Sequence, residues 1–336
     1  MKQRPNDRTR RKQPQSEYAD FLNAPLPQDT VQVLKGNQNE VDNLNLLFNR
    51  FVWTWTVDEE DKSWKLEEKA KRYFLSQVSK FSSGDGVLEA SITRLRRSLQ
   101  SLNENGLAIE EMEMSTQWRL VVGMGYKGSL EIGMTLHHLY GFPYIPATAV
   151  KGLARAWAEL VEKAEQSTIA RVFGSESKDE RKAESHQLGS VLFLDALPID
   201  WPKLDVDIMN PHYPDYYKDP KNNPPGDWQN PVPIPFLAVA PGTRFWFGLA
   251  SKSAEDLKKA KQWLVSGLKE LGIGAKTSAG YGYFKEPARV QATQLVSGTA
   301  AQEGQKTVTT TPALQQPAGT VKAEIIDSQS KPPKVK

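Results

Sequence analysis

The sequence predicts an α+β protein in which an antiparallel sheet carries two helices on one face. From Gln117 to Phe284, segments with strand-like and helix-like patterns follow the order β, α, β, β, α, β. That order is typical of the ferredoxin-like fold, also called split βαβ. A region of helical spacing precedes these elements, and segments with few apolar residues lie at both ends of the chain. We therefore expect one ferredoxin-like domain with an N-terminal helical region, a long proline-rich insertion and disordered termini.

Composition sets the broad class of protein. The chain has 336 residues, of which 39% are hydrophobic, enough for a substantial core. No apolar run is long enough to cross a membrane, and the N-terminus lacks the apolar stretch of a signal peptide, so we expect a soluble, cytoplasmic protein. Cysteine is absent, which excludes disulfides, thiolate zinc sites and cysteine nucleophiles. The net charge of +3 is small, so a nucleic-acid site would have to come from local clusters of cations.

Charge and composition divide the chain into four parts. Residues 1–43 are predicted to be a basic, largely disordered arm, since residues 1–15 hold six Lys and Arg, one Asp and no apolar run. Residues 44–115 are predicted to be a helical region packed on the core, and residues 116–288 the ferredoxin-like domain. The remainder, 289–336, has no aromatic residue and is rich in Thr, Gln, Ala and Pro, which predicts a disordered tail.

Each element rests on a local pattern. In the N-terminal region, apolar residues at helical spacing predict one helix within 59–81 and a second within 87–106, separated by "SSGDG". The domain then starts with a strand from Gln117, in "WRLVVGMG". Its later elements are a helix capped by Thr148, a buried strand, an alternating strand, a helix capped by Ser253, and a short last strand. They correspond to residues 148–161, 190–198, 243–250, 253–271 and 280–284.

A long connection separates the second and third predicted strands. It holds ten prolines between 198 and 235 and includes "IMNPHYPDYY", residues 208–217. Loops of this length in compact domains are usually functional or disordered. Asn210 and His212 lie among tyrosines there, and such side chains suit stacking on splayed bases or docking to a partner protein. The alternative is a loop that packs on its own sheet.

The stretch "GIGAKTSAGYGYF", residues 272–284, matches neither familiar phosphate-loop motif. A P-loop needs glycine where the chain has Ala275 and Glu270, before Lys276. A dinucleotide fingerprint starting at Gly272 meets Thr277 at its last position, and it would follow a helix where it should follow a strand.

What remains is a glycine loop that bears a lysine and two hydroxyls between the last helix and the last strand. It suits an extended phosphate chain, which approaches backbone closely only where side chains are absent. The alternative is a helix C-cap and bulge with the lysine in solvent. The loop residues predicted to bind are Lys276, Thr277, Ser278, Gly272, Gly274, Gly280 and Gly282.

A second candidate lies at the start of the first domain helix. Lys151 falls in the first turn, where N–H groups and the helix dipole favour anions, and Arg155 follows one turn later. These two residues and Thr148 are candidate phosphate-binding residues. The alternative is two exposed cations on a helix surface.

Five motifs resemble, in order, those of the RAMP superfamily, the RNA-binding proteins of CRISPR systems. They are "GMTLHHLYGFPYIPATAVKG", "FGSES", "GSVLFLDALP", "DIMNPHYPDYY" and "GIGAKTSAGYGYF". The first contains a segment similar to the superfamily's I-P-G-[ST]-[SA]-[LV]-K-G-x-x-R pattern, with Ala147 in place of its glycine. The resemblance covers about residues 117 to 286 and is strongest to a subunit of the type III-B (Cmr) effector complex.

The resemblance implies an RRM-like, ferredoxin-like RAMP domain and a non-catalytic role. Its implied partners are guide RNA, bound toward the 3′ end, target RNA, and the backbone, small and terminal RAMP subunits of the complex. It implies no membrane association, no cofactor and no metal. The predicted RNA-binding residues are then those of the glycine loop together with Thr148, Lys151, Arg155, His138, Asn210 and His212.

An enzymatic alternative remains open. A metal-independent endoribonuclease that processes guide precursors would need a histidine near a basic partner, and His138 with Lys151 is the candidate pair. His137 and His138 are adjacent, so on a strand they would face opposite sides and could not chelate one ion. Asp195 is a single carboxylate at a strand end, which favours a turn-capping role over a metal site. A protein-interaction scaffold with an incidental basic loop is the third possibility.

Overall fold

The computed structural model of the chain describes residues 25–35, 41–58, 60–84, 86–126, 128–175, 187–226, 228 and 230–287. All of them belong to one compact unit that spans Met1–Arg289. The basic stretch 1–15 and the predicted tail 289–336 lie outside the described residues.

The main sheet is antiparallel and is built around two long strands. β3 (Ala108–Thr116) pairs with β10 (Arg244–Ser251) along its length, from Ser251↔Ala108 to Arg244↔Ser115. The strand order is β11-β3-β10-β6, and β7 also pairs with β10. The shorter strands are β11 (Phe284–Lys285), β6 (Val191–Phe193) and β7 (Leu197–Pro198). The chain thus has mixed helix and sheet content, as the α+β prediction required.

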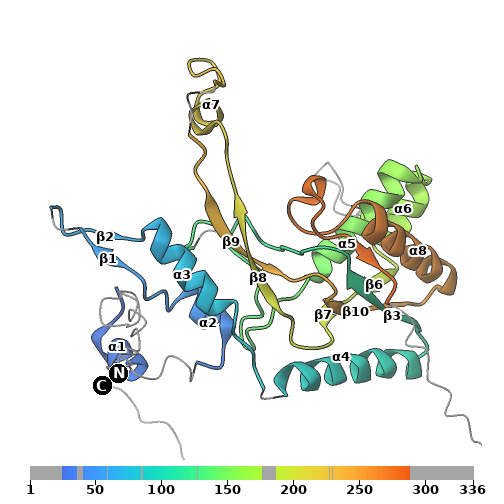
Figure 1. Cartoon of the computed structure of the whole chain (residues 1–336). Coiled ribbons are helices and arrows are strands. Elements are labelled where there is room, and N and C mark those ends of the chain that lie inside the picture. Colours follow the sequence, from blue (N-terminus) through green and yellow to red (C-terminus); the bar gives the residue numbers. More distant parts are fainter. Residues whose placement is uncertain are drawn as a thin grey trace, which may run out of the picture. The chain divides into compact units, whose positions relative to one another are not determined.

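One face of the sheet is covered by helices that follow β3 in the chain (Figure 1). Phe245, Phe247 and Leu249 on β10 are buried in one core cluster with Trp263 and Leu264 of α8. The Ser253 hydroxyl accepts a hydrogen bond from the Asp256 N–H, which confirms the predicted cap of that helix. The elements on this side are α5 (Ala147–Ala156), the π-helical turn η3 (Trp157–Val161), α6 (Gln166–Phe173) and α8 (Ala254–Glu270).

The other face of the sheet is covered by α4 (Val87–Glu104), the second helix predicted for the N-terminal region. Strand residues alternate between faces, so Trp246 and Ala250 point opposite to Phe245 and pack against Leu99. The Trp246 indole N–H donates to the Glu111 carboxylate at 2.8 Å. Figure 1 shows α4 lying along the sheet, so helices cover both of its faces.

Two strand and helix boundaries differ from the prediction. The first strand of the sheet is 108–116, in "AIEEMEMST", whereas the predicted strand from Gln117 contains only an isolated bridge between Leu120 and Val239. The β-forming composition of 118–125 misled the prediction, because Val121 is buried by contacts outside the sheet. The helix predicted within 59–81 starts only at Glu68, since Trp64 and Lys65 pair with a preceding strand.

The remaining N-terminal elements precede α4 in the chain. Leu44 and Phe48 of α2 and Phe74 of α3 are buried in the main core cluster. These elements are α1 (Gln28–Leu34), α2 (Leu44–Asn49), β1 (Thr56–Val57), β2 (Trp64–Lys65) and α3 (Glu68–Val78).

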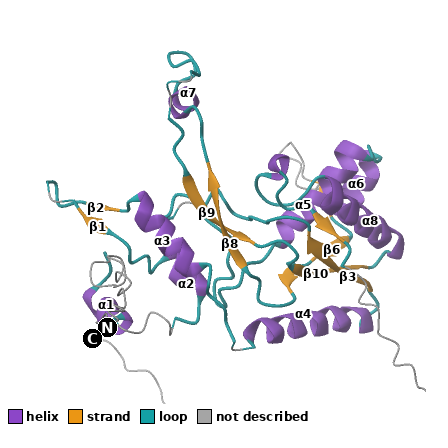
Figure 2. Ribbon diagram, in the orientation of Figure 1, coloured by secondary structure: helices purple, strands orange, loops and turns teal. Residues whose placement is uncertain are grey.

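The proline-rich connection is a β-hairpin and not only a loop. β8 (Leu204–Met209) pairs antiparallel with β9 (Ile234–Val239). The connection between the two strands contains α7 (Pro214–Lys218), at the end of the hairpin (Figure 2). A further short pair joins β4 (Gly174–Ser175) to β5 (Gln187–Leu188).

Candidate nucleic-acid interface

The glycine-rich loop is pinned along its length to the segment that follows β3. Ala275 N–H donates to the Val121 carbonyl at 2.8 Å, and Gly282 N–H donates to the Arg119 carbonyl at 2.8 Å. The loop also closes on itself, because Ile273 N–H donates to the Gly282 carbonyl at 2.9 Å. These three bonds fix the base of the loop to the segment after β3 and use backbone groups that could otherwise bind a ligand.

Two of the loop glycines are required by these close approaches. A Cβ on Gly282, at φ +74°, would lie 1.9 Å from the Ile273 carbonyl oxygen, and a Cβ on Gly274, at φ +92°, would lie 2.3 Å from that of Val121. Gly280, at φ +89°, has open space where its Cβ would be. The base of the loop thus uses glycine for packing, whereas Gly280 leaves backbone open at the exposed turn.

Lys276 is half-buried and lies against aromatic rings. Its backbone is left-handed, at φ 58°, and it precedes the 3₁₀ turn η5 (Thr277–Ala279). The ammonium nitrogen lies 5.5 Å from the Phe236 ring centroid and 5.7 Å from that of Tyr281. Cation–π contacts of this kind hold the ammonium without neutralising it. Thr277 is half-buried and Ser278 is exposed.

The loop and the β8–β9 hairpin are joined by a polar network centred on Asp207. The Tyr281 hydroxyl donates to the Asp207 carboxylate, and the Arg119 guanidinium donates to it at 3.1 Å. Burial acts to raise the pKa of Asp207, but hydrogen bonds from Tyr281 and Ile208 and the charges of Arg119 and Lys276 outweigh it and lower that pKa. Burial and the hydrogen bond to Asp207 raise the pKa of Tyr281 to about 12.

This network was missed at the sequence level. Its carboxylates alternate with apolar residues in "LDVDIM", where Leu204 is buried and Asp205 and Asp207 are partly exposed. Period-two alternation is the signal of a half-buried strand and could have identified β8. Nothing in the local sequence indicates that these carboxylates meet Arg119 and Tyr281.

The α5 candidates are arranged differently from the prediction. Thr148 does not cap the helix, which begins at Ala147; instead the Asp195 carboxylate accepts the Ala147 N–H at 2.7 Å. Asp195 was predicted to cap a turn, and it instead accepts a hydrogen bond at the N-terminus of α5. Since a carboxylate already lies at this helix end, a phosphate there would meet a like charge.

The two cations of α5 differ in their pairing. Arg155 forms an ion pair with Glu159 at 2.7 Å. Lys151 is half-buried, and no ion pair between described residues includes it. Thr148 is exposed in the first turn.

The adjacent histidines lie at a tight turn. The His137 ring stacks on Tyr140 with centroids 4.6 Å apart, and its Nδ1 accepts the Tyr140 N–H at 3.3 Å. Burial lowers the pKa of His137. His138 is exposed, and its carbonyl accepts a hydrogen bond from Asn43 at 3.5 Å. No hydrogen bond, ion pair or ring contact between described residues joins His138 to Lys151, so the endoribonuclease pair is not assembled here.

The hairpin candidates lie at the end of β8. Asn210 and His212 are exposed, and the His212 ring makes an edge contact with Tyr213 at 6.4 Å. Figure 1 shows α7, which follows them, at the far end of the hairpin. In the described part of the chain, no hydrogen bond, ion pair or ring contact joins the loop, α5 and this turn. The fold instead brings the glycine loop to the body of the hairpin, at Asp207 and Phe236, where no site residue was predicted.

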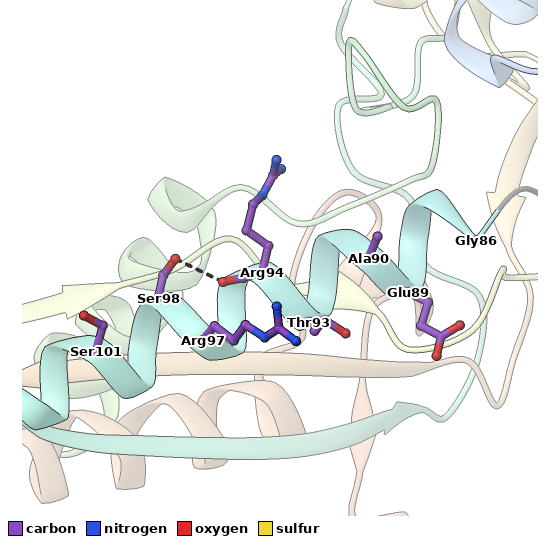
Figure 3. Close-up of a pocket in the computed structure, with 8 residues that line it drawn as sticks. All are labelled: Gly86, Glu89, Ala90, Thr93, Arg94, Arg97, Ser98 and Ser101. Atoms are coloured by element: carbon purple, nitrogen blue, oxygen red, sulfur yellow. Dashed lines mark hydrogen bonds between the residues drawn. The ribbon is translucent and has the colours of Figure 1, made fainter. Parts of the chain in front are cut away.

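An open hollow of about 710 Å³ runs along the outer face of α4 (Figure 3). Its lining residues are Gly86, which immediately precedes α4, and residues of that one helix, so it is an exposed helix surface and not an enclosed site. The full set is Gly86, Glu89, Ala90, Thr93, Arg94, Arg97, Ser98 and Ser101.

The described residues hold neither a metal-binding cluster nor a membrane-spanning helix. No group of three or more His, Asp or Glu side chains there is arranged to hold a metal ion. Among the helices that the structure describes, none has both the length and the apolar character needed to span a bilayer.

Comparison with known proteins places these features in a family. A model of the RAMP superfamily matches residues 114–285. The chain is 30% identical over 331 residues to the CRISPR system Cmr subunit Cmr6 of Pyrococcus furiosus, covering 76% of this chain and 97% of that protein. It is 27% identical over 271 residues to the CRISPR system CMR subunit Cmr6 of Saccharolobus solfataricus, covering 78% and 80% of the two chains.

One solved structure shows a similar fold. A chain in the cryo-EM structure of the Type III-B Cmr-beta bound to cognate target RNA superposes with a TM-score of 0.53 at 23% identity, covering 76% of this chain and 88% of the other. Sequence and fold therefore lead to one conclusion: the chain belongs to the RAMP superfamily and, within it, to the family of Cmr6 subunits.

Proposed function

We propose that this chain is a non-catalytic, RNA-binding subunit of a type III-B CRISPR effector complex, in which a guide RNA directs the complex to target RNA in antiviral defence. The observation that carries the proposal is the 30% identity to a Cmr6 subunit over 97% of that protein's length. In this role the chain binds the guide toward its 3′ end and contacts neighbouring backbone, small and terminal RAMP subunits in the cytoplasm.

The proposed fold of the domain is ferredoxin-like, and the strand order β11-β3-β10-β6, with α5 and α8 packed on one face, supports it. RRM-type recognition uses the open face of such a sheet. Here α4 lies on that face, with Leu99 packed on Trp246. The RNA backbone is therefore bound at the loops along the sheet's edge, and the exposed turn of the glycine loop is the first of these.

The proposed contacts of that turn follow from its chemistry. Lys276 supplies a cation held over two rings, Ser278 an exposed hydroxyl, and Gly280 an open stretch of backbone. Phosphate oxygens accept hydrogen bonds from ammonium and hydroxyl groups. The Gly280 N–H already donates to the Thr277 carbonyl at 2.9 Å, so Gly280 contributes only the absence of a side chain, which lets a phosphate approach closely. The remaining proposed contacts are Thr277, Gly272, Gly274 and Gly282 in the loop, Thr148, Lys151 and Arg155 on α5, and His138, Asn210 and His212.

Replacing Lys276 by Asn tests the loop. Asn tolerates the left-handed backbone, so the substitution removes the charge with little strain. We expect single-stranded RNA to bind about fivefold more weakly, and the slope of log affinity against log salt to fall by about 0.7, because one phosphate contact is lost. Titrations at several salt concentrations measure both quantities.

Two matched variants accompany this test. Lys276→Arg keeps the charge and should keep the salt slope, and Lys258→Gln removes an exposed cation on α8 and should leave RNA affinity unchanged. An unchanged slope in Lys276→Asn would remove Lys276 from the interface.

The function as a whole is tested by purifying the tagged full chain from its native host. Guide RNA and sibling subunits should copurify. Purified chain incubated with repeat RNA in EDTA should give no specific product; a product abolished by His138→Ala would replace the proposal with the endoribonuclease function.

A further inference from the structure

An exposed tryptophan stands next to the glycine-rich loop. Trp118 follows β3 by two residues and is 47% exposed. The backbone on both sides of it is bonded to the end of the loop, because Gln117 N–H donates to the Tyr283 carbonyl at 2.7 Å and Gly282 N–H donates to that of Arg119. The position of Trp118 relative to the loop is therefore fixed by the main chain.

The indole ring is also held by a neighbouring guanidinium. The centre of the Arg119 guanidinium lies 4.7 Å from the Trp118 ring centroid. Arg119 cannot move freely, since Asp205 accepts its Nε–H at 3.0 Å and Asp207 accepts from its terminal nitrogen at 3.1 Å. An exposed aromatic ring anchored in this way keeps one orientation, which lowers the entropy lost when a flat ligand stacks on it.

We propose that Trp118 is a stacking platform for an unpaired base of an RNA strand whose phosphates follow the glycine-rich loop. The inference rests on the proposed RNA-binding function and adds a base contact to it. Indole rings bind bases of any sequence through their π-faces, and a cationic group nearby holds the backbone. Lys276 supplies that cation, in the loop to which the backbones of Gln117 and Arg119, on either side of Trp118, are bonded.

The surroundings of Trp118 favour a nucleic-acid base over a protein partner. Trp and Arg are both common at protein-binding hot spots, but Asp is depleted there. Here Arg119 lies over the ring, and two carboxylates, Asp205 and Asp207, lie directly beyond it. Because the two carboxylates offset the arginine, Arg119 is a poor phosphate ligand, and stacking is the interaction that the ring offers.

The test compares variants of the full chain in titrations with a single-stranded RNA of mixed sequence. Trp118→Ala should bind roughly 5- to 150-fold more weakly, the range for loss of one base stack, with an unchanged salt slope. Trp118→Phe should retain most of the affinity. The control is Trp64→Ala, since Trp64 is 43% exposed on β2, outside the proposed interface, and its loss should change nothing.

Photo-cross-linking locates the contact directly. RNA carrying 5-iodouridine should cross-link to the tryptic peptide of residues 98–119, in which Trp118 is the sole aromatic residue. The cross-link should disappear in Trp118→Ala and persist in Trp64→Ala.

The outcomes separate this inference from the proposed function. If the chain and its native complex bind no RNA, both are overturned. If Lys276→Asn weakens binding but Trp118→Ala matches Trp64→Ala, the stacking platform alone is overturned. Normal RNA binding by Trp118→Ala, combined with loss of sibling subunits on copurification, would overturn it in favour of a protein-docking role.

Discussion

Gly282→Ala is expected to lower the free energy of unfolding by about 4 kcal/mol, because it combines a steric clash with a disfavoured backbone conformation. The added Cβ would lie 1.9 Å from the Ile273 carbonyl oxygen, at φ +74°. That carbonyl belongs to backbone, so no side-chain rotation relieves the contact. The loop would have to separate from itself, which breaks the Ile273 to Gly282 hydrogen bond. Urea unfolding measures the change.

The matched control is Gly280→Ala in the same loop. Gly280 has a similar φ of +89°, but there is open space around the added methyl. The substitution should therefore lower the free energy of unfolding only by the cost of a left-handed backbone, about 1 kcal/mol. Equal losses in the two variants would show that close packing at the base of the loop does not hold it together. RNA binding by Gly280→Ala should be measured as well, since Gly280 is the open position at the proposed interface.

The helical and central strand elements could be predicted because their signals are local. Ser253 lies just before an amphipathic run and caps α8, and the alternating "TRFWFGLA" lies in the β10 region. These two patterns are decided within a few residues. Asp195 is different: its carboxylate was predicted to cap a turn, and it instead accepts from the first residue of α5, which lies 48 residues earlier in the chain.

The elements that were wrong or missed depend on contacts between distant segments. Pro235 lies inside β9, paired with Ile208, although proline disfavours strands; the pairing exists because the hairpin packs its Phe236 against Val121 and Tyr281. The same packing brings Lys276 over Phe236. A lysine in a glycine loop therefore suggested a solvent-exposed phosphate ligand, and the sequence carried no sign of its aromatic support.

Removal of the Asp207 carboxylate tests whether the packing of Lys276 against Phe236 and Tyr281 depends on the polar network. Asp207→Ala is expected to lower the free energy of unfolding by about 3 kcal/mol, because the buried Tyr281 hydroxyl loses its acceptor and Arg119 loses one of two partners. Tyr281→Phe removes the hydroxyl itself and should cost about 1 kcal/mol. A double-mutant cycle should show coupling of about 1 kcal/mol or more between the two positions. Additive losses would mean that the hydrogen bond does not hold the loop to the hairpin.

The same carboxylate makes stability depend on pH in a predictable direction. Its pKa is lowered in the folded state from the usual 3.8, so its contribution is complete above that value and is lost as pH falls through the folded pKa. The pKa of Asp256 is also lowered, so the wild type alone does not isolate Asp207. The informative quantity is the free energy of unfolding of the wild type minus that of Asp207→Asn, and this difference should shrink below about pH 4.

Asp207→Asn should also change RNA binding in the opposite direction to its effect on stability. The amide still accepts a hydrogen bond from Tyr281, but it removes a negative charge that acts on Lys276. A charge at contact distance in water is worth about 1 kcal/mol or less, so RNA affinity at low salt should rise by up to about fivefold. In Lys276→Asn the same substitution should give a smaller gain. An equal gain in both backgrounds would mean that Asp207 acts on the RNA independently of Lys276.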